Sequence, residues 1–169
     1  MTAMTALFTF RYYLLHTRAG FGWVPSTFEV SRGDRNFYFG APRAALASQQ
    51  VVDDLDTLAE PGDRLFVGPM DLSRTWYSDA VFYWLFPEME PATYFIEMDP
   101  GLANAEDSRL ADDLSSADFV VLTAFWAGWQ EANASMDFGS PVPNEVLAER
   151  FCQFRAYQDG LVRLYYRCR

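Results

Sequence analysis

The sequence predicts an α/β protein, in which a three-layer, Rossmann-like, mostly parallel sheet carries helices on both faces and ends in a C-terminal antiparallel hairpin. Three observations indicate this fold class. From residue 42 onward, short apolar runs alternate with segments of helical spacing. Pro and Gly residues separate these segments. Two final runs flank the turn sequence Gln158-Asp159-Gly160, which is typical of a hairpin. We therefore expect one α/β domain over residues 27–169.

Residues 1–26 form a separate N-terminal segment in this prediction. Its apolar stretch, residues 4–15, is interrupted by Arg11, and it is shorter than the roughly 20 apolar residues that span a bilayer. It also lacks the basic start and small-residue cleavage site of a secretory signal. Two interpretations remain open: an amphipathic first helix packing on the domain, or the outer end of a membrane helix. In the second, Tyr12 and Tyr13 would lie among lipid headgroups.

The first elements of the domain follow from local patterns. Residues 27–40 alternate apolar and polar side chains around a polar turn and predict a β-hairpin. Pro42 opens a helix of apolar residues at helical spacing, which Pro61-Gly62 ends. Residues 64–68 (RLFVG) are a short apolar run between turn residues, which suits a buried parallel strand.

The same unit then recurs. Ser78-Asp79 can cap a helix that ends before Pro87, and residues 93–98 (TYFIEM) predict a strand. Ser108 can cap a short helix that leads into a strand over residues 118–123 (DFVVLT). Strands that alternate with helices imply parallel strands joined by crossovers. Farther along, a brief helix over residues 144–149 precedes the two hairpin strands, residues 151–157 and 161–168.

Composition excludes several classes of function. The 169 residues carry a net charge of −10, which is the wrong sign for binding nucleic acid. All 13 basic residues are Arg, and no G-x-G-x-x-G or Walker sequence occurs. His16 is the only histidine, so a multi-histidine metal site or a Ser-His nucleophile is not expected. We expect no cofactor and no metal.

Candidate ligand-binding residues lie where the predicted parallel strands end, because open α/β sheets bind ligands there. Asp71, Arg74, Asp99 and Trp126 follow these strand ends. Carboxylates, a guanidinium and an indole suit a polyhydroxylated ligand, and Trp126 with Trp129 can form a sugar platform. The alternative is local: Asp71 pairs with Arg74 to order a loop, and Asp99 makes an Asx-type turn before Pro100. No residue is assigned a catalytic role.

Cys152 and Cys168 lie on the two strands of the predicted C-terminal hairpin. A two-residue loop leaves them one position out of register, and a bulge or a longer turn would align them. Cross-strand neighbours are close enough for a disulfide, which would imply an oxidising compartment. The alternative is two reduced cysteines in a cytosolic protein.

Several phrases carry a resemblance to a known family: PGDRLFVGPMDLSRTWYSD (residues 61–79), PATYFIEMDPGLAN (91–104), SRLADDLSSADFVVLT (108–123) and the closing ERFC and YYRC. The chain resembles the C-terminal soluble domain of polytopic, glycosyltransferase-like (GT-C type) membrane proteins of high-GC bacteria, relatives of mannosyltransferases that use lipid-linked sugars. The resemblance implies an extracytoplasmic appendage that follows a membrane helix. The catalytic acids of such proteins are expected in loops between membrane helices, so it assigns no catalytic residue here.

Three functions follow from these observations. The first is a non-catalytic accessory domain of a membrane glycosyltransferase-like system, on the extracytoplasmic face of the cell membrane, that binds a glycan, a lipid-linked sugar or a partner protein. The second is a small soluble enzyme that acts on a sugar or nucleotide-like substrate through Asp71, Arg74 and Asp99. The third is an interaction module that docks through exposed Trp and Tyr side chains.

Overall fold

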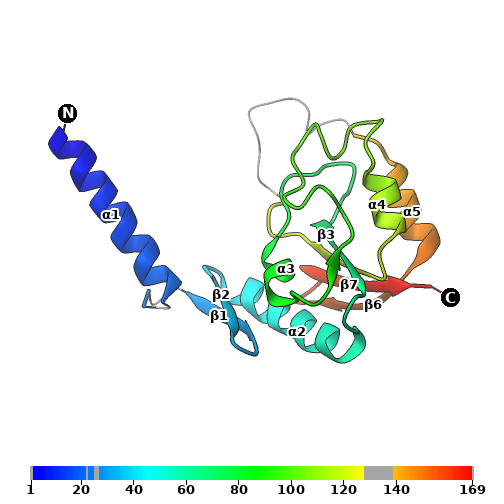
Figure 1. The fold of residues 1–169 in the computed structure, drawn as a ribbon, viewed down its shortest axis with the longest axis horizontal. Coiled ribbons are helices and arrows are strands. Elements are labelled where there is room, and N and C mark those ends of the chain that lie inside the picture. The colour runs from blue at the N-terminus through cyan, green and yellow to red at the C-terminus, as the bar shows by residue number, and fades with distance from the viewer. Residues whose placement is uncertain (1, 22, 25–26, 128–138, 169) are drawn as a thin grey trace.

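The structure, a computed structural model, describes residues 2–21, 23–24, 27–127 and 139–168. It is a mixed α/β fold with a five-stranded sheet and a separate two-stranded hairpin (Figure 1). The helices are α1 (Thr2–Gly20), α2 (Pro42–Leu58), α3 (Val81–Leu85), α4 (Leu110–Ser115) and α5 (Val142–Arg150). The strands are β1 (Phe28–Arg32), β2 (Arg35–Phe39), β3 (Arg64–Pro69), β4 (Glu90–Pro91), β5 (Phe119–Thr123), β6 (Phe151–Tyr157) and β7 (Val162–Arg167).

The main sheet has the strand order β4-β3-β5-β7-β6. β3 is parallel to both β4 and β5, whereas β7 is antiparallel to β5 and to β6. The predicted mostly parallel sheet is therefore a mixed one. The cause is the C-terminal hairpin, which joins the same sheet and places β7 directly beside β5, with Phe119 opposite Tyr166.

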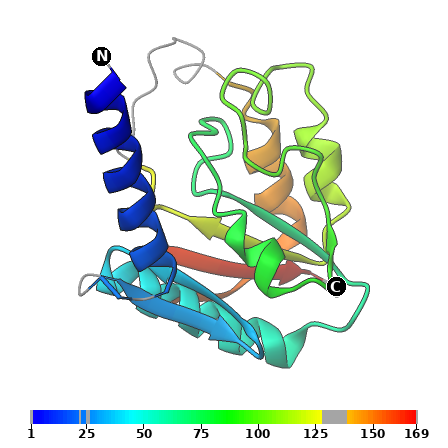
Figure 2. The same ribbon diagram turned by 60° about the vertical axis from the view of Figure 1, so that its left-hand side comes forward.

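Helices cover both faces of this sheet, because successive residues of a strand point to opposite faces. Val67 of β3 and Val121 of β5 belong to one buried cluster with residues of α2 and α3. Their neighbours Phe66 and Val120 belong to a second cluster with residues of α4, against which α5 packs. Figure 2 shows α2 on one side of the sheet and α4 and α5 on the other.

One predicted strand is wrong. Residues 93–98 form turns, and the parallel strand is only Glu90–Pro91. The reason lies outside the segment: the buried carboxylate of Asp113 accepts hydrogen bonds from the backbone N–H of Tyr94 at 2.9 Å and from the hydroxyl of Thr93 at 3.2 Å. The bond from Tyr94 satisfies a backbone N–H that a strand would pair with β3.

The shortness of β4 leaves part of the outer edge of β3 without a partner strand. β4 pairs only with Arg64 and Leu65. Beyond them, the N–H of Val67 donates to the hydroxyl of Tyr83 in α3 at 2.9 Å, and Pro69 has no N–H to satisfy. A side chain therefore completes the hydrogen bonding of this edge.

The β1–β2 hairpin is fastened to the helices beside it. The side chain of Gln49 accepts from the N–H of Ser31 at 2.8 Å and donates to its carbonyl at 3.0 Å, as a neighbouring strand would. Arg32 donates to Asp56 at 2.7 Å and to Glu88 at 2.5 Å. These bonds fix where the aromatic side chains of β2 lie relative to the main sheet.

Helix α1 extends beside the hairpin, away from the main sheet (Figures 1 and 2). Its large apolar side chains are exposed on more than one side, among them Leu7, Phe8, Phe10 and Tyr13, with exposed fractions of 58%, 70%, 63% and 69%. Among the described residues, no helix combines the length and the apolar character needed to cross a membrane.

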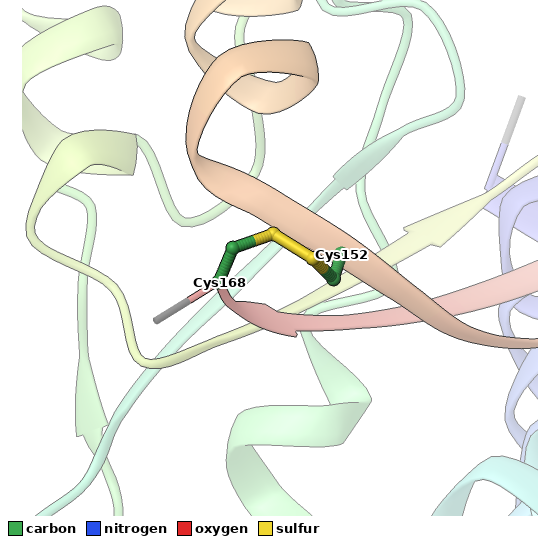
Figure 3. The surroundings of a disulfide bond; sticks show 2 residues. All are labelled: Cys152 and Cys168. Atoms are coloured by element: carbon green, nitrogen blue, oxygen red, sulfur yellow. A yellow bond between two sulfur atoms is a disulfide. The ribbon is translucent and has the colours of Figure 1, made fainter.

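The structure joins Cys152 and Cys168 in a disulfide, with 5.3 Å between their Cα atoms (Figure 3). A bulge on β6 between Gln153 and Arg155 places Cys152 opposite Tyr166. The cysteines are thus diagonal neighbours and not the directly opposed pair that a bulge was expected to produce. The bond joins the start of β6 to the residue that follows β7.

Candidate functional site

The candidate site lies at the carboxyl ends of β3 and β5, the two central parallel strands. From β3 the chain continues to β4 on one side of the sheet, whereas after β5 the next strand is β6 on the opposite side. Two neighbouring strands whose connections diverge in this way open a crevice at their carboxyl ends. The loop over residues 70–80 and the segment over residues 124–127 border that crevice.

Asp79 is the central residue of this region, and only 8% of it is exposed. The hydroxyl of Thr123, the last residue of β5, donates a hydrogen bond of 2.5 Å to its carboxylate, and the indole N–H of Trp126 donates another. Burial raises the pKa of Asp79 from 3.8 to about 6, against the lowering effect of these two hydrogen bonds. The group therefore holds a proton to much higher pH than an ordinary aspartate.

The helix cap predicted at Ser78 and Asp79 is wrong. α3 begins after Ala80 without a side-chain cap. The hydroxyl of Ser78 donates to the carbonyl of Ile96, while the carboxylate of Asp79 is directed toward Thr123. The carboxylate of Asp79 thus forms a hydrogen bond with the end of β5 and does not cap α3.

Two sizeable pockets meet at Asp79 and Trp126. The first has a volume of about 380 Å³ and includes Phe39, Phe125 and Arg43 in its lining. The second has a volume of about 510 Å³. Its further lining residues include Asn36, Phe37, Ser78 and Trp84. Each pocket thus has aromatic residues and Asp79 in its lining.

A smaller pocket of about 120 Å³ brings two predicted residues together, because Asp71 and Trp126 both line it. Asp71 accepts from the N–H of Ser73 at 3.0 Å, from its hydroxyl at 2.7 Å and from the amide of Asn144 at 2.8 Å. Partial burial acts to raise the pKa of Asp71, but these bonds and the charge of Arg74 outweigh it and lower the pKa. Asp71 is thus an ionised group that orders its loop.

Arg74 and Asp99 are exposed and do not line the three pockets at the strand ends. The backbone N–H of Arg74 donates to the carbonyl of Asp71 in a turn. The backbone carbonyl of Asp99 accepts from the N–H groups of Leu102 and Ala103, which is a backbone turn and differs from the expected Asx-type turn, where the carboxylate would be the acceptor. Trp129 lies outside the described residues.

Sequence reasoning missed Asp79 because its position before a helix suggested a cap. One signal could have found it: Asp79 is the only charged residue between Arg74 and Pro87, in an otherwise largely apolar and aromatic stretch. A carboxylate among such residues becomes buried unless it reaches solvent. Phe37, which lines the second pocket, was placed in the predicted hairpin and was given no role in ligand binding.

Comparisons with protein-family models, with curated proteins and with solved structures find no match to this chain. Over the described residues, no cluster of three or more His, Cys, Asp or Glu side chains is arranged to hold a metal ion. The polar groups described at the site are Asp79, Thr123 and Trp126, with aromatic rings around them. Such groups can stack against a flat apolar face and exchange hydrogen bonds with hydroxyl groups.

Proposed function

We propose that this chain is a glycan-binding accessory domain of a membrane-associated, glycosyltransferase-like system. The observation that carries the proposal is the pairing of Asp79 with Trp126 where two aromatic-lined pockets meet. The sugar can belong to a free glycan or to a lipid-linked one, since the same chemistry recognises both.

The groups present match the two surfaces of a sugar ring. A pyranose has C–H groups on its faces, which pack on indole and phenyl rings, and hydroxyls at its edge. Trp126 is 39% exposed, so its ring is accessible. Because its pKa is about 6, the carboxyl of Asp79 occurs in both its ionised and its protonated form near neutral pH. It can therefore accept a hydrogen bond from a hydroxyl group or donate one to it. Pockets of this size are typical of small-ligand sites.

Helix α1 supports the membrane part of the proposal. Its exposed apolar side chains are accompanied by the cations Arg11 and Arg18 and by no carboxylate, in contrast to the acidic chain as a whole. Apolar and cationic groups together favour the surface of an anionic bilayer. Flotation of the full chain with phosphatidylglycerol vesicles tests this, with Phe8→Glu expected to weaken the association and Leu46→Glu, at an exposed position on α2, as the matched control.

The disulfide supports an extracytoplasmic location. A bond between Cys152 and Cys168 forms and persists in an oxidising compartment. Thiol counting on the protein isolated from its native host, under conditions that block exchange, should find no free thiol. Two free thiols would contradict this location.

We further propose that the fold is a three-layer, Rossmann-like variant in which the hairpin β6–β7 replaces the later parallel strands. The parallel pairing of β3 with β4 and β5 and the helices on both faces support this. An experimental structure of the full chain tests it through the strand order and the side on which each connection crosses.

A second candidate function is catalytic. A buried acid with a pKa near neutrality is a feature of general acid–base groups, and Asp79 lines the pockets that would hold a substrate. Turnover of nitrophenyl glycosides that disappears in Asp79→Asn would favour an enzyme. Binding without turnover would favour the accessory domain.

The decisive experiment measures binding of soluble hexose glycosides by tryptophan fluorescence and calorimetry. Trp126→Ala should weaken binding by about tenfold or more, because stacking and the bond to Asp79 are lost together. Trp23→Ala is the matched control, since Trp23 is an exposed indole on another part of the molecule. Absence of binding at about 10 mM glycoside, or equal binding by Trp126→Ala, would contradict the proposal.

A further inference from the structure

We propose that the site takes a linear oligosaccharide, with one sugar ring in each of the two pockets that meet at Asp79 and Trp126. This inference rests on the proposed glycan binding and adds the length and placement of the ligand. The two pockets share both residues in their linings and therefore lie next to each other.

The first pocket forms one subsite. Phe39 at the end of β2 and Phe125 after β5 pack edge to face, with 5.3 Å between ring centroids. Both rings line this pocket, and so does the charged residue Arg43. Arg43 is anchored by its bond of 2.8 Å to Asp159. A sugar ring fits these groups, because its apolar face can pack on the phenyl rings and the hydroxyls at its edge can bond to Arg43.

The second pocket forms the other subsite, and its main platform is Trp84, which is 54% exposed. The guanidinium of Arg35 lies 4.3 Å from the ring centroid and donates to the carbonyl of Trp84 at 2.6 Å. This cation–π contact holds the indole in place before any ligand arrives. Asn36 and Ser78 supply polar groups in the same lining.

The size and chemistry of the two pockets favour an oligosaccharide over a single sugar. Each pocket alone falls within the range of roughly 300–1,000 Å³ that small-ligand sites occupy. Each has its own aromatic platform, Phe125 in the first and Trp84 in the second. A monosaccharide would use one platform, whereas two linked rings use both and keep the hydroxyls near their linkage within reach of Asp79.

The test is a chain-length series with the full protein, using mannose, mannobiose and mannotriose, and glucose, maltose and maltotriose. In one of these series, affinity should rise by about tenfold from one ring to two and change little from two to three. Trp84→Ala should remove the gain of the second ring, so that this variant binds one ring and two rings with similar affinity. Circular dichroism of this variant confirms that it folds, and Trp23→Ala should behave as the unaltered protein.

The outcomes separate this inference from the proposed function. Equal affinity for one and two rings, or a two-ring gain that survives in Trp84→Ala, overturns the two-subsite arrangement while glycan binding stands. Absence of binding in both series overturns both proposals.

Discussion

The substitution Asp79→Asn should change how the stability of this protein depends on pH. The carboxyl group is almost fully buried, and burial raises its pKa from 3.8 to about 6 although Thr123 and Trp126 donate hydrogen bonds to it. Asparagine is neutral at every pH, and its Oδ1 can still accept the hydrogen bond from Thr123. The substitution thus removes the titration and keeps the acceptor.

The sign and the size of the effect follow from linkage. The folded state holds the proton of Asp79 more tightly than the unfolded state does. Protonation of Asp79 therefore stabilises the folded state fully below a pH of about 4, and this stabilisation is lost as pH rises through about 6. The difference between 3.8 and about 6 corresponds to about 3 kcal/mol. Relative to that of the unaltered protein, the free energy of unfolding of Asp79→Asn should therefore rise by about 3 kcal/mol from low to high pH.

Urea unfolding followed by circular dichroism, at a series of values between about pH 4 and about pH 8, measures this gain. Asp112→Asn is the matched control, because Asp112 is exposed on α4. Its difference from the unaltered protein should not change with pH in this way. A pH-independent difference between Asp79→Asn and the unaltered protein would show that Asp79 titrates normally, and the reasoning about its burial would fail.

Two further predictions concern stability. Replacing Cys152 and Cys168 by Ser should cost about 3 kcal/mol, because their bond closes a loop of sequence separation 16, and lower Tm by about 6–12 °C. Calorimetry measures this, and an unchanged Tm would mean that the hairpin needs no cross-link. Gly139→Ala should cost about 1–3 kcal/mol or more, since its Cβ would lie 2.1 Å from the carbonyl oxygen of Ser73. Gly40→Ala, with nothing within 4 Å, is the control, and equal melting temperatures would contradict the prediction.

The sequence predicted the elements whose causes are local. Pro42 begins α2 as expected, and the apolar runs of β3 and β5 are strands within a residue or two of their predicted bounds. Both hairpins are present, because alternating apolar residues and turn sequences decide their register. The faces of these elements follow from the same periodicity.

The errors have causes that lie far along the chain. Residues 93–98 have the composition of a strand, but Asp113 accepts the hydrogen bonds of Thr93 and Tyr94 from a different element. Asp79 meets Thr123 from 44 positions away. Local propensity carries no information about such contacts, so tertiary interactions override it.

The candidate site was predicted in part. Placing ligand-binding residues at the strand ends located Asp71 and Trp126, which line one small pocket, because topology alone determines that edge. Arg74 and Asp99 were chosen for their chemistry and their place after a strand, yet neither lines a pocket at the strand ends. The resemblance to glycosyltransferase-like membrane proteins, and the function it implies, stay predictions.

The hydrogen bond from the N–H of Val67 to the hydroxyl of Tyr83 hinders self-association of the protein through this sheet edge. An open strand edge invites pairing with another chain, which can lead to aggregation. Here a strand from a second molecule would have to displace the tyrosine to reach the N–H of Val67, and it would find no donor at Pro69. At the opposite edge, β6 carries a bulge and the charged side chain of Arg155, which also discourage pairing. The sheet is thus protected at both margins against growth into larger β-structures.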